Sequence, residues 1–251
     1  MTKMTHGKYT ELVENLFEKG WFEHLKPFID SPEFDKIIDF LKEEKRLGKT
    51  ITPFDKNCFK AFKECPFDKV KVVIIGQDPY PNIINNHFEA DGLAFSYTKS
   101  NADDNHVPKS LNVILREVQR DVYNNEAEYS NVFIDTNLSR WAKQGVLLLN
   151  SSLTTLVGNP NGHRDLWALF IEYTLNQLNL YHTGVIYLLW GKDAQKNKEH
   201  IYQSTNHVLE CPHPAAQFYS GGKITFSGCS HFSKTNEIIE KNNGRDFRIN
   251  W

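Results

Sequence analysis

The feature that most constrains the fold is a short apolar run that stops abruptly at a cluster of polar residues. Residues 70–75 read Val-Lys-Val-Val-Ile-Ile, and the sequence Gly-Gln-Asp-Pro-Tyr-Pro follows at 76–81. A run rich in β-branched residues is typical of a strand buried on both faces, as in a parallel sheet. Open α/β folds place their ligand crevice beyond the carboxyl ends of such strands. The polar cluster is therefore a candidate site as well as a turn.

Three further apolar runs have the same character, and helical patterns separate them. The expected strands are 70–75, 146–149, 185–189 and 207–210. Apolar residues three or four apart predict helices within 9–46 and at 56–64, 110–122, 164–180 and 233–242. This alternation predicts an α/β fold with a central four-stranded, mostly parallel sheet and helices on both faces. We expect residues 1–251 to form a single domain, with a flexible N-terminus at 1–8.

Three connecting segments complete this expectation. Residues 81–91 are rich in Asn and predict a long irregular loop, of the kind that is more often functional than idle. Ser110 is expected to cap the helix that begins there. Residues 123–131 are polar and predict a surface loop.

Composition places the chain among ordinary globular proteins. Of its 251 residues, 40% are hydrophobic and 24% are charged, which is enough apolar material for a large core. The net charge of −2 does not predict a polyanionic ligand, so a local patch would have to hold one. No apolar run reaches the ~18 residues of a membrane span. The four cysteines form no Cys-x-x-Cys pair and the N-terminus lacks a signal-peptide core, so we expect a cytoplasmic protein.

Polar residues follow each of the expected strands. Gln77 and Asp78 follow the first, Asn150 the second, Gly191 the third and His213 the fourth. Because carboxyl ends of parallel strands meet at one edge of a sheet, we expect these residues to converge. A carboxylate, an amide that both donates and accepts, and a neutral imidazole suit a planar polar ligand such as a nucleobase.

Two aromatic residues, Tyr80 and Phe95, lie close to this cluster in the sequence. They would provide a wall and a stacking face for such a ligand. Core packing alone would explain them equally well.

Two Cys-x-His pairs, Cys211-x-His213 and Cys229-x-His231, raise the alternative of a metal site. Residues two apart on a strand share a side, so each pair could offer two ligands. The spacing differs from common structural zinc patterns, and each pair lies beside a proline or within a polar turn. We expect no metal ion and no cofactor.

Ten short motifs, each unspecific alone, follow one another in a specific order. They are Thr52-Pro53, Phe59-x-x-Phe62, 70–80, 92–96, 108–112, 141–150, 188–191, 194–196, His213-Pro214 and 231–236. In this set the chain resembles the uracil-DNA glycosylases of the uracil-specific branch, from about Trp21 to the C-terminus. The resemblance implies a monomeric DNA-repair hydrolase that flips uracil out of single- and double-stranded DNA and starts base-excision repair.

The resemblance implies catalytic roles for two matched residues. Asp78 would orient or activate water and stabilise the sugar cation, and His213 would hydrogen-bond O2 of the departing uracil. Cleavage of an N-glycosidic bond creates a cationic sugar and an anionic base, so this pair would stabilise both charges. The base must leave the helix to be reached, at a cost of a few kcal/mol.

The resemblance also implies how the base is held. Gln77 would contact uracil through its backbone, and Tyr80 would fill the space beside C5. Phe95 would stack on the base and Asn150 would read its polar edge. These four residues form the predicted substrate-binding set.

Contacts to DNA are implied at the edge of the site. Ser110, Gly191 and the segment after Pro214 would hold the DNA backbone. The family's intercalating Leu falls by count on Gln217, so we hypothesise that Phe218 or Tyr219 wedges into the gap left by the flipped base.

The chain departs from the family at Pro81, where a His is usual, and in two lengthened loops, 81–94 and 214–228. His87 in the first loop is a candidate substitute for the missing His. These departures favour one rival, a glycosylase-like DNA-binding or scaffold subunit with weak or no catalysis. A second rival is a metal-dependent hydrolase that uses the Cys/His pairs. A proteinaceous inhibitor is a further candidate partner.

Overall fold

The structure, a computed structural model, describes residues 7–101, 103–124 and 135–251. Its centre is a sheet of four strands, β2 (Val72–Gly76), β5 (Val146–Asn150), β7 (Ile186–Trp190) and β8 (His207–Cys211). The strand order is β5-β2-β7-β8, and every neighbouring pair is parallel. The predicted α/β architecture is confirmed, with a sheet that is wholly rather than mostly parallel.

The apolar runs explain the order of the strands. β2 lies between β5 and β7, and its residues 72–75 have no exposed surface. β5 and β8 are the two edge strands; β5 is buried along its whole length, whereas in β8 only Cys211 is buried. The buried strands are runs of apolar residues, whereas the partly exposed edge strand β8 carries polar ones.

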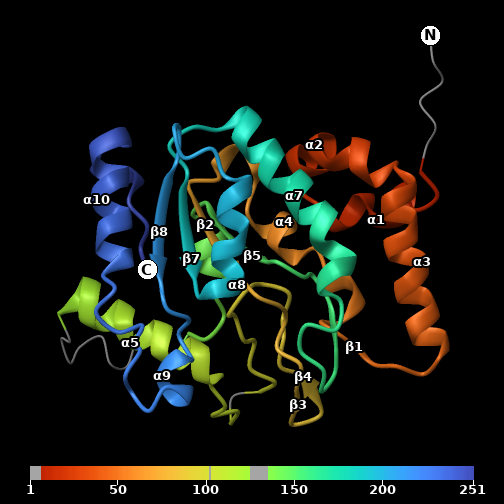
Figure 1. The fold of residues 1–251 in the computed structure, drawn as a ribbon, viewed down its shortest axis with the longest axis horizontal. Coiled ribbons are helices and arrows are strands. Elements are labelled where there is room, and N and C mark those ends of the chain that lie inside the picture. The colour runs from red at the N-terminus through yellow and green to blue at the C-terminus, as the bar shows by residue number, and fades with distance from the viewer. Residues whose placement is uncertain (1–6, 102, 125–134) are drawn as a thin grey trace.

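Helices cover both faces of this sheet (Figure 1), with α5 and α10 on one side and α1, α2, α3 and α7 on the other. The α-helices are α1 (Thr10–Val13), α2 (Lys19–Ile29), α3 (Pro32–Arg46), α4 (Lys60–Glu64), α5 (Lys109–Tyr123), α6 (Ser139–Ala142), α7 (Arg164–Tyr181), α8 (Lys192–Gln195), α9 (Ala216–Tyr219) and α10 (His231–Asn243). Short 3-10 helices lie at Glu14–Leu16, Asp55–Asn57, Phe67–Lys69, Lys196–His200 and Arg245–Phe247. None of the helices in these ranges is long and apolar enough to span a membrane.

The predicted helix at 110–122 begins one residue earlier than expected. α5 starts at Lys109, and its N-cap is Pro108, which makes no side-chain cap bond. Ser110 lies within the first turn and is buried, so its prediction as the cap was wrong. Pro108 stands at the N-cap position instead, and its side chain has no oxygen that could accept an N–H of the first turn.

Two further pairs of strands were not predicted, because each strand has only two residues and shows no periodic pattern. β1 (Ile51–Thr52) pairs with β6 (Thr155–Leu156), and β3 (Ile83–Ile84) pairs with β4 (His87–Phe88), both antiparallel. The predicted irregular segment 81–91 therefore contains a hairpin at 83–88, with irregular residues on either side of it. Its turn residues Asn85 and Asn86 both have positive φ, as a tight hairpin turn requires. In Figure 1 this hairpin and α9 lie at the same end of the molecule.

One hydrophobic cluster joins the sheet to the helices on both sides. The five tryptophans, Trp21, Trp141, Trp167, Trp190 and Trp251, are each exposed by 1% or less. The C-terminal residue is among them, so the described chain is anchored to the core at its end.

At the other end, Gly7 donates to Asp30 and Lys8 pairs with Asp39. The first six residues of the predicted flexible N-terminus lie outside the described residues, as does most of the surface loop predicted at 123–131.

Candidate active site

A cavity of about 320 Å³ lies beyond the carboxyl ends of β2, β5 and β8. Its lining residues are Gln77, Asp78, Pro79, Tyr80, Pro81, Ala90, Gly92, Leu93, Phe95, Ser110, Asn150, His213, Ala215 and Tyr219. The fold thus brings together every predicted site residue except Gly191 and Phe218, from segments far apart in the sequence.

Asp78 is half-buried at the end of β2. Its Oδ2 accepts a hydrogen bond from the backbone N–H of Asn161 at 2.6 Å, whereas Oδ1 accepts none from the described residues. Burial raises the pKa of Asp78 above its ordinary value, and the Asn161 N–H opposes this rise. The Asp193 carboxylate raises the pKa further, and Arg164 lowers it. Few partners satisfy the charge, so the carboxylate is available to a cation in the cavity.

His213 lies across the cavity from β2 and is held in one tautomer. Its Nδ1 accepts the backbone N–H of Ala215 at 3.1 Å, which assigns the proton of the neutral ring to Nε2. Burial lowers the pKa of His213, and the Asp193 carboxylate opposes that shift. The ring is therefore neutral at pH 7 and offers a single N–H donor.

Gly191 supports this histidine directly. Gly191 has φ +88°, and a Cβ at that position would lie 2.7 Å from Cβ of His213. A side chain would displace His213, so the glycine has a packing role beside the predicted DNA contact.

Asn150 ends β5 and faces the cavity with a free amide. Its side chain makes no hydrogen bond to any described residue, although the residue is only 7% exposed. Asn150 is paired in register with Gly76, and a Cβ on Gly76 would come within 2.3 Å of Asn150 Oδ1. The glycine at the end of the first apolar run therefore makes room for the amide. An amide that faces a cavity without a protein partner can both donate to and accept from a ligand.

Two aromatic rings form the walls. The Tyr80 hydroxyl donates to the Phe95 carbonyl at 3.1 Å, which fixes one ring against the other's backbone. The Phe95 ring centroid lies 5.9 Å from that of His213 and 5.5 Å from that of Trp190. Phe95 has φ +65°, an uncommon conformation for a bulky residue. Such strain persists where the surroundings impose it, and functional sites are where it concentrates.

Gln77 turns its side chain away from the base-sized space. Its Nε2 donates to Asn161 Oδ1 at 2.9 Å, and its carbonyl accepts the Ser152 N–H at 3.1 Å. This orientation is compatible with a ligand contact through the backbone of Gln77. The role of Asn161 was missed in the sequence, although the Asn-Gly dipeptide at 161–162 is a signal for a left-handed turn residue.

Together these groups suit one kind of chemistry. A planar polar ring could stack on Phe95, pair with the Asn150 amide and receive the Nε2–H of His213. A carboxylate would then stand on the side where positive charge develops when a bond to that ring breaks. This is electrostatic preorganisation for a leaving anion and a cation.

Comparisons with known proteins indicate which kind of planar ring the cavity would hold. The family model of the uracil DNA glycosylase superfamily matches residues 62–240. A Coxiella burnetii uracil-DNA glycosylase is 39% identical over 215 residues, which cover 84% of this chain and 85% of that protein. The chain belongs to the uracil-DNA glycosylase superfamily. An Acinetobacter baumannii uracil-DNA glycosylase is 36% identical over 242 residues, which cover 95% of this chain and 94% of that protein.

Solved structures of the superfamily share the fold. A mimivirus uracil-DNA glycosylase superposes with a TM-score of 0.80 at 24% identity, covering 92% of this chain and 86% of that one. A mimivirus UNG variant in complex with UGI gives a TM-score of 0.82 at 25% identity, covering 95% and 90%. The four-stranded parallel sheet is therefore that of the superfamily.

Pro81, where the family usually has His, lines the cavity and offers no side-chain polar group. Its carbonyl accepts the Gly158 N–H at 2.8 Å, which ties the segment to the loop before α7. His87 does not replace the missing His, because its Nε2 lies 2.7 Å from the Thr98 carbonyl and the residue is not part of the lining. In this chain Asp78 therefore shares the cavity with a proline at this position and not with a histidine.

The two wedge candidates lie on α9 and differ in position. Tyr219 lines the cavity and is 85% exposed, whereas Phe218 is 51% exposed and does not line it. Gln217, where the family's Leu falls by count, is only partly exposed. An exposed aromatic ring at the mouth of a cavity is typical of a binding surface.

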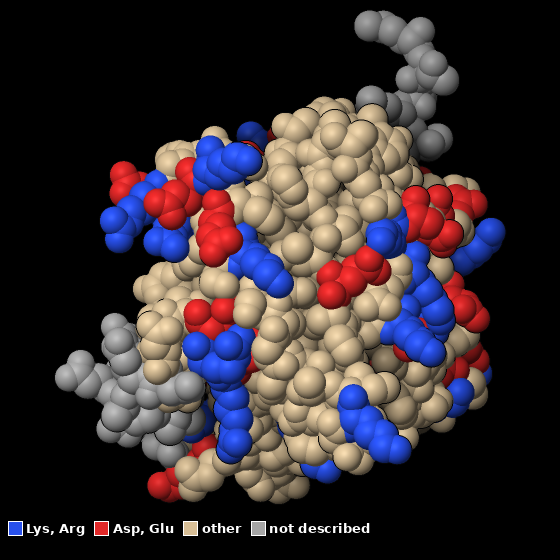
Figure 2. Space-filling model, turned by 60° about the vertical axis from the view of Figure 1, so that its left-hand side comes forward, with Lys and Arg blue, Asp and Glu red and all other residues tan. Residues whose placement is uncertain are grey.

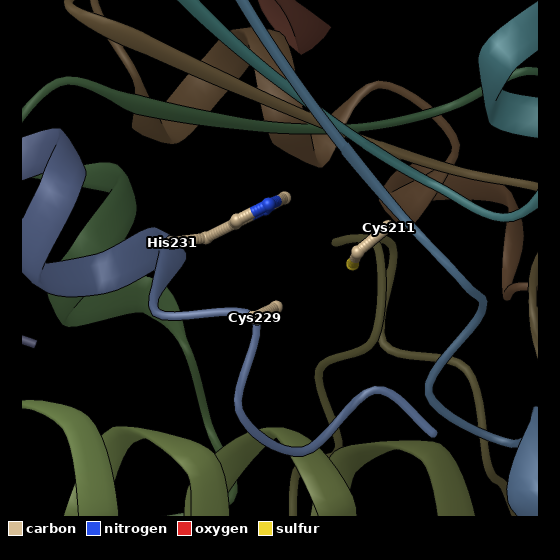
Figure 3. A group of neighbouring side chains, drawn as sticks. All are labelled: Cys211, Cys229 and His231. Atoms are coloured by element: carbon tan, nitrogen blue, oxygen red, sulfur yellow. The ribbon is translucent and has the colours of Figure 1, made fainter. Parts of the chain in front are cut away.

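The Cys/His pairs do not assemble as the sequence suggested. Ligand atoms of Cys211, Cys229 and His231 lie within 4.8 Å of one another (Figure 3), whereas His213 turns into the cavity. The Trp190 Nε1–H donates to His231 Nδ1 at 3.1 Å, which places the ring proton on Nε2. Neither nitrogen then offers a lone pair to a metal ion unless this buried bond breaks. These contacts favour a structural role for His231.

The surface has no extended field of one sign on the face that Figure 2 draws, where Lys and Arg side chains are interspersed with Asp and Glu. This agrees with the net charge of −2. A nucleic acid would therefore have to be held by local contacts around the cavity.

Proposed function

We propose that this member of the superfamily excises uracil from DNA by hydrolysing its N-glycosidic bond. The observation that carries the proposal is the shared cavity, in which Asp78 and His213 flank a space lined by Asn150 and Phe95. Each of these groups has a specific task in cleaving a base from a sugar, and their geometry supports all of them at once.

The chemistry divides between the two catalytic residues. As the bond to N1 lengthens, positive charge grows on the sugar and negative charge on the base. The free Oδ1 of Asp78 stabilises the sugar and orients the attacking water. The Nε2–H of His213 donates to uracil O2, which carries the departing charge. A neutral donor serves here, because it stabilises the anion without having to lose its proton.

Selectivity follows from the groups that surround the base. Tyr80 occupies the space beside C5, so the methyl group of thymine is excluded. The Asn150 amide pairs with the O4 and N3–H edge of uracil. Cytosine presents a donor at position 4, and an amide held in one orientation rejects it. The backbone of Gln77 supplies a further contact.

DNA reaches the cavity at its mouth. The base leaves the helix at a cost of a few kcal/mol, and stacking on Phe95 returns ~1–3 kcal/mol. Ser110 and Gly191 hold the DNA backbone, and Tyr219 or Phe218 fills the gap in the stack. Single-stranded DNA needs no wedge, so both forms of DNA are substrates.

The same mouth is the candidate surface for an inhibitor. The mimivirus UNG variant with the same fold was solved in complex with UGI. A protein that covers the cavity would compete with DNA. We also propose that the protein acts as a monomer.

The test compares the wild type with Asp78→Asn on an oligonucleotide that contains one uracil. The amide keeps the shape of the carboxylate and removes its charge, so uracil release falls by about 10²-fold or more while binding of the DNA persists. Unchanged turnover in this variant would remove Asp78 from its role. Binding without release in the wild type would instead favour the scaffold alternative.

A further inference from the structure

Asn161 makes the contacts that hold the two residues after β2. It lies in the loop between β6 and α7, and its backbone N–H donates to Asp78 Oδ2 at 2.6 Å. Its side-chain Oδ1 accepts from Gln77 Nε2 at 2.9 Å. One loop residue thus fixes a catalytic carboxylate through its backbone and the neighbouring amide through its side chain.

The conformation of Asn161 is what aims its N–H. Its φ is +64°, in the left-handed region that Asn and Gly enter most readily. The side chain is exposed, so core packing does not require this residue type. The left-handed conformation of Asn161 allows its hydrogen bonds to Asp78 and Gln77.

The turn around Asn161 is fixed by other residues. The buried Thr155 hydroxyl donates to the Asn159 carbonyl at 2.8 Å and accepts the Gly162 N–H at 3.1 Å. The Arg164 N–H donates to the Asn161 carbonyl at 3.2 Å. Bonds on both sides of Asn161 therefore preorganise its N–H before any ligand arrives.

The Asn161 N–H has a larger effect on the pKa of Asp78 than the charged side chains nearby. Asp193 and Arg164 also act on the carboxyl, but they form an ion pair with each other at 3.0 Å and offset one another. Burial raises the pKa of Asp78, and the Asn161 N–H is the largest influence that opposes it.

We propose that Asn161 is a positioning residue, whose backbone N–H holds Oδ2 of Asp78 so that Oδ1 faces the reacting sugar and water. This inference rests on the proposed function, because it assigns the working oxygen of the proposed catalytic carboxylate. Asn161 does not line the cavity and makes its contribution through Asp78 and Gln77.

Two substitutions separate the backbone from the side chain. Asn161→Gly keeps the N–H and the left-handed conformation, so kcat stays within about threefold of the wild type. Asn161→Val opposes that conformation and misplaces the N–H, so kcat falls about tenfold or more with little change in KM. The acid limb of the kcat profile moves to higher pH in Asn161→Val and stays in place in Asn161→Gly. Circular dichroism and Tm verify that both variants fold.

A second measurement separates this inference from the proposed function. Carbon-13 NMR titration of the Asp78 carboxyl, without DNA, gives a higher pKa in Asn161→Val than in Asn161→Gly. If the wild type released no uracil but this difference held, the proposed function would fail and the positioning role would stand. If the wild type were active and Asn161→Val matched it in rate and in Asp78 pKa, the positioning role would be overturned. Equal losses of kcat in both variants would also overturn it.

Discussion

The floor of the cavity and its rim differ in how tightly the chain constrains them. The floor, formed by Gly76, Asp78, Asn150 and His213, lies at the carboxyl ends of β2, β5 and β8, and a single added methyl group at Gly76 would reach Asn150. The rim, formed by α9 and residues 214–228, contains Gly221 and Gly222 with open space around both. The difference teaches that the sheet fixes the proposed catalytic groups, whereas the proposed contact to DNA belongs to a segment with open space around its glycines.

This contrast matches one of the departures from the family, the lengthened segment 214–228, whereas Pro81 lines the cavity itself. The floor keeps the predicted carboxylate, amide and imidazole, and the rim carries aromatic residues in a lengthened segment. The proposed intercalating residue of the rim can be substituted without disturbing the floor, because the side chains of Phe218 and Tyr219 are largely exposed. The predictions below set the two regions against each other.

The largest effect is expected from Gly76→Ala, which substitutes none of the proposed catalytic or substrate-binding residues. The added Cβ would lie 2.3 Å from Asn150 Oδ1 and 3.1 Å from Ala94 Cβ, so the amide must move. A misplacement of this size lowers kcat/KM for uracil by about 10²-fold. Single-turnover kinetics measure it, and a thermal melt separates this effect from unfolding. Wild-type kinetics in this variant would show that Asn150 does not read the base.

The second-largest effect concerns Tyr80, which forms one wall of the cavity. In Tyr80→Ala the space beside C5 opens, so discrimination against thymine falls by about 10–200-fold, the range expected for one methyl-sized group. Tyr80→Phe is the matched control, because it keeps the ring and loses only the hydroxyl, which bonds to the Phe95 carbonyl and to the backbone of Leu111. Release of thymine from mismatched duplexes is the measurement. Full exclusion of thymine by Tyr80→Ala would place the rejection of the methyl group elsewhere.

The third effect belongs to the rim and should depend on the form of the DNA. Tyr219→Ala loses about 5- to 20-fold in rate on duplex DNA and little on single strands, because stacking is worth ~1–3 kcal/mol per base. Phe218→Ala is the neighbouring control and should lose less, since Phe218 does not line the cavity. If both variants keep full activity on duplex DNA, the wedge hypothesis fails.

The smallest effect is a shift along the pH axis. Burial raises the pKa of Asp78, and the reaction needs its charged form, so activity falls as pH drops through that raised pKa. The acid limb of kcat therefore lies above the ordinary value of an Asp, 3.8. Asp193→Asn removes a carboxylate that raises this pKa, so the limb moves to lower pH. An unmoved limb would mean that another group sets it.

Much of the floor was predictable from residue types, and the reason is physical. A strand buried on both faces leaves an unmistakable apolar run, and parallel strands bring their carboxyl ends together whatever the connecting loops are. Asp78 and Asn150 come at the ends of such runs, and His213 follows the less apolar edge strand β8, so their convergence followed from the parallel order of the strands. The family motifs then supplied the roles.

Contacts made by the backbone could not be predicted in the same way. The N–H of Asn161 reaches Asp78 only because a distant turn takes a left-handed conformation, and any residue carries an N–H. The two-residue strands, such as β3 and β4, are too short for periodicity to register. Ser110 was misjudged as a cap because Pro108 stands at the N-cap position of α5.

The most direct test of the cavity's role is release of free base from matched duplexes that carry uracil, thymine or cytosine at one position. With the purified wild-type protein, the proposed roles predict that uracil alone is released and that an abasic site remains in the strand. Single strands containing uracil should react as well. No release of uracil, or release of thymine or cytosine at a comparable rate, would contradict the proposed function.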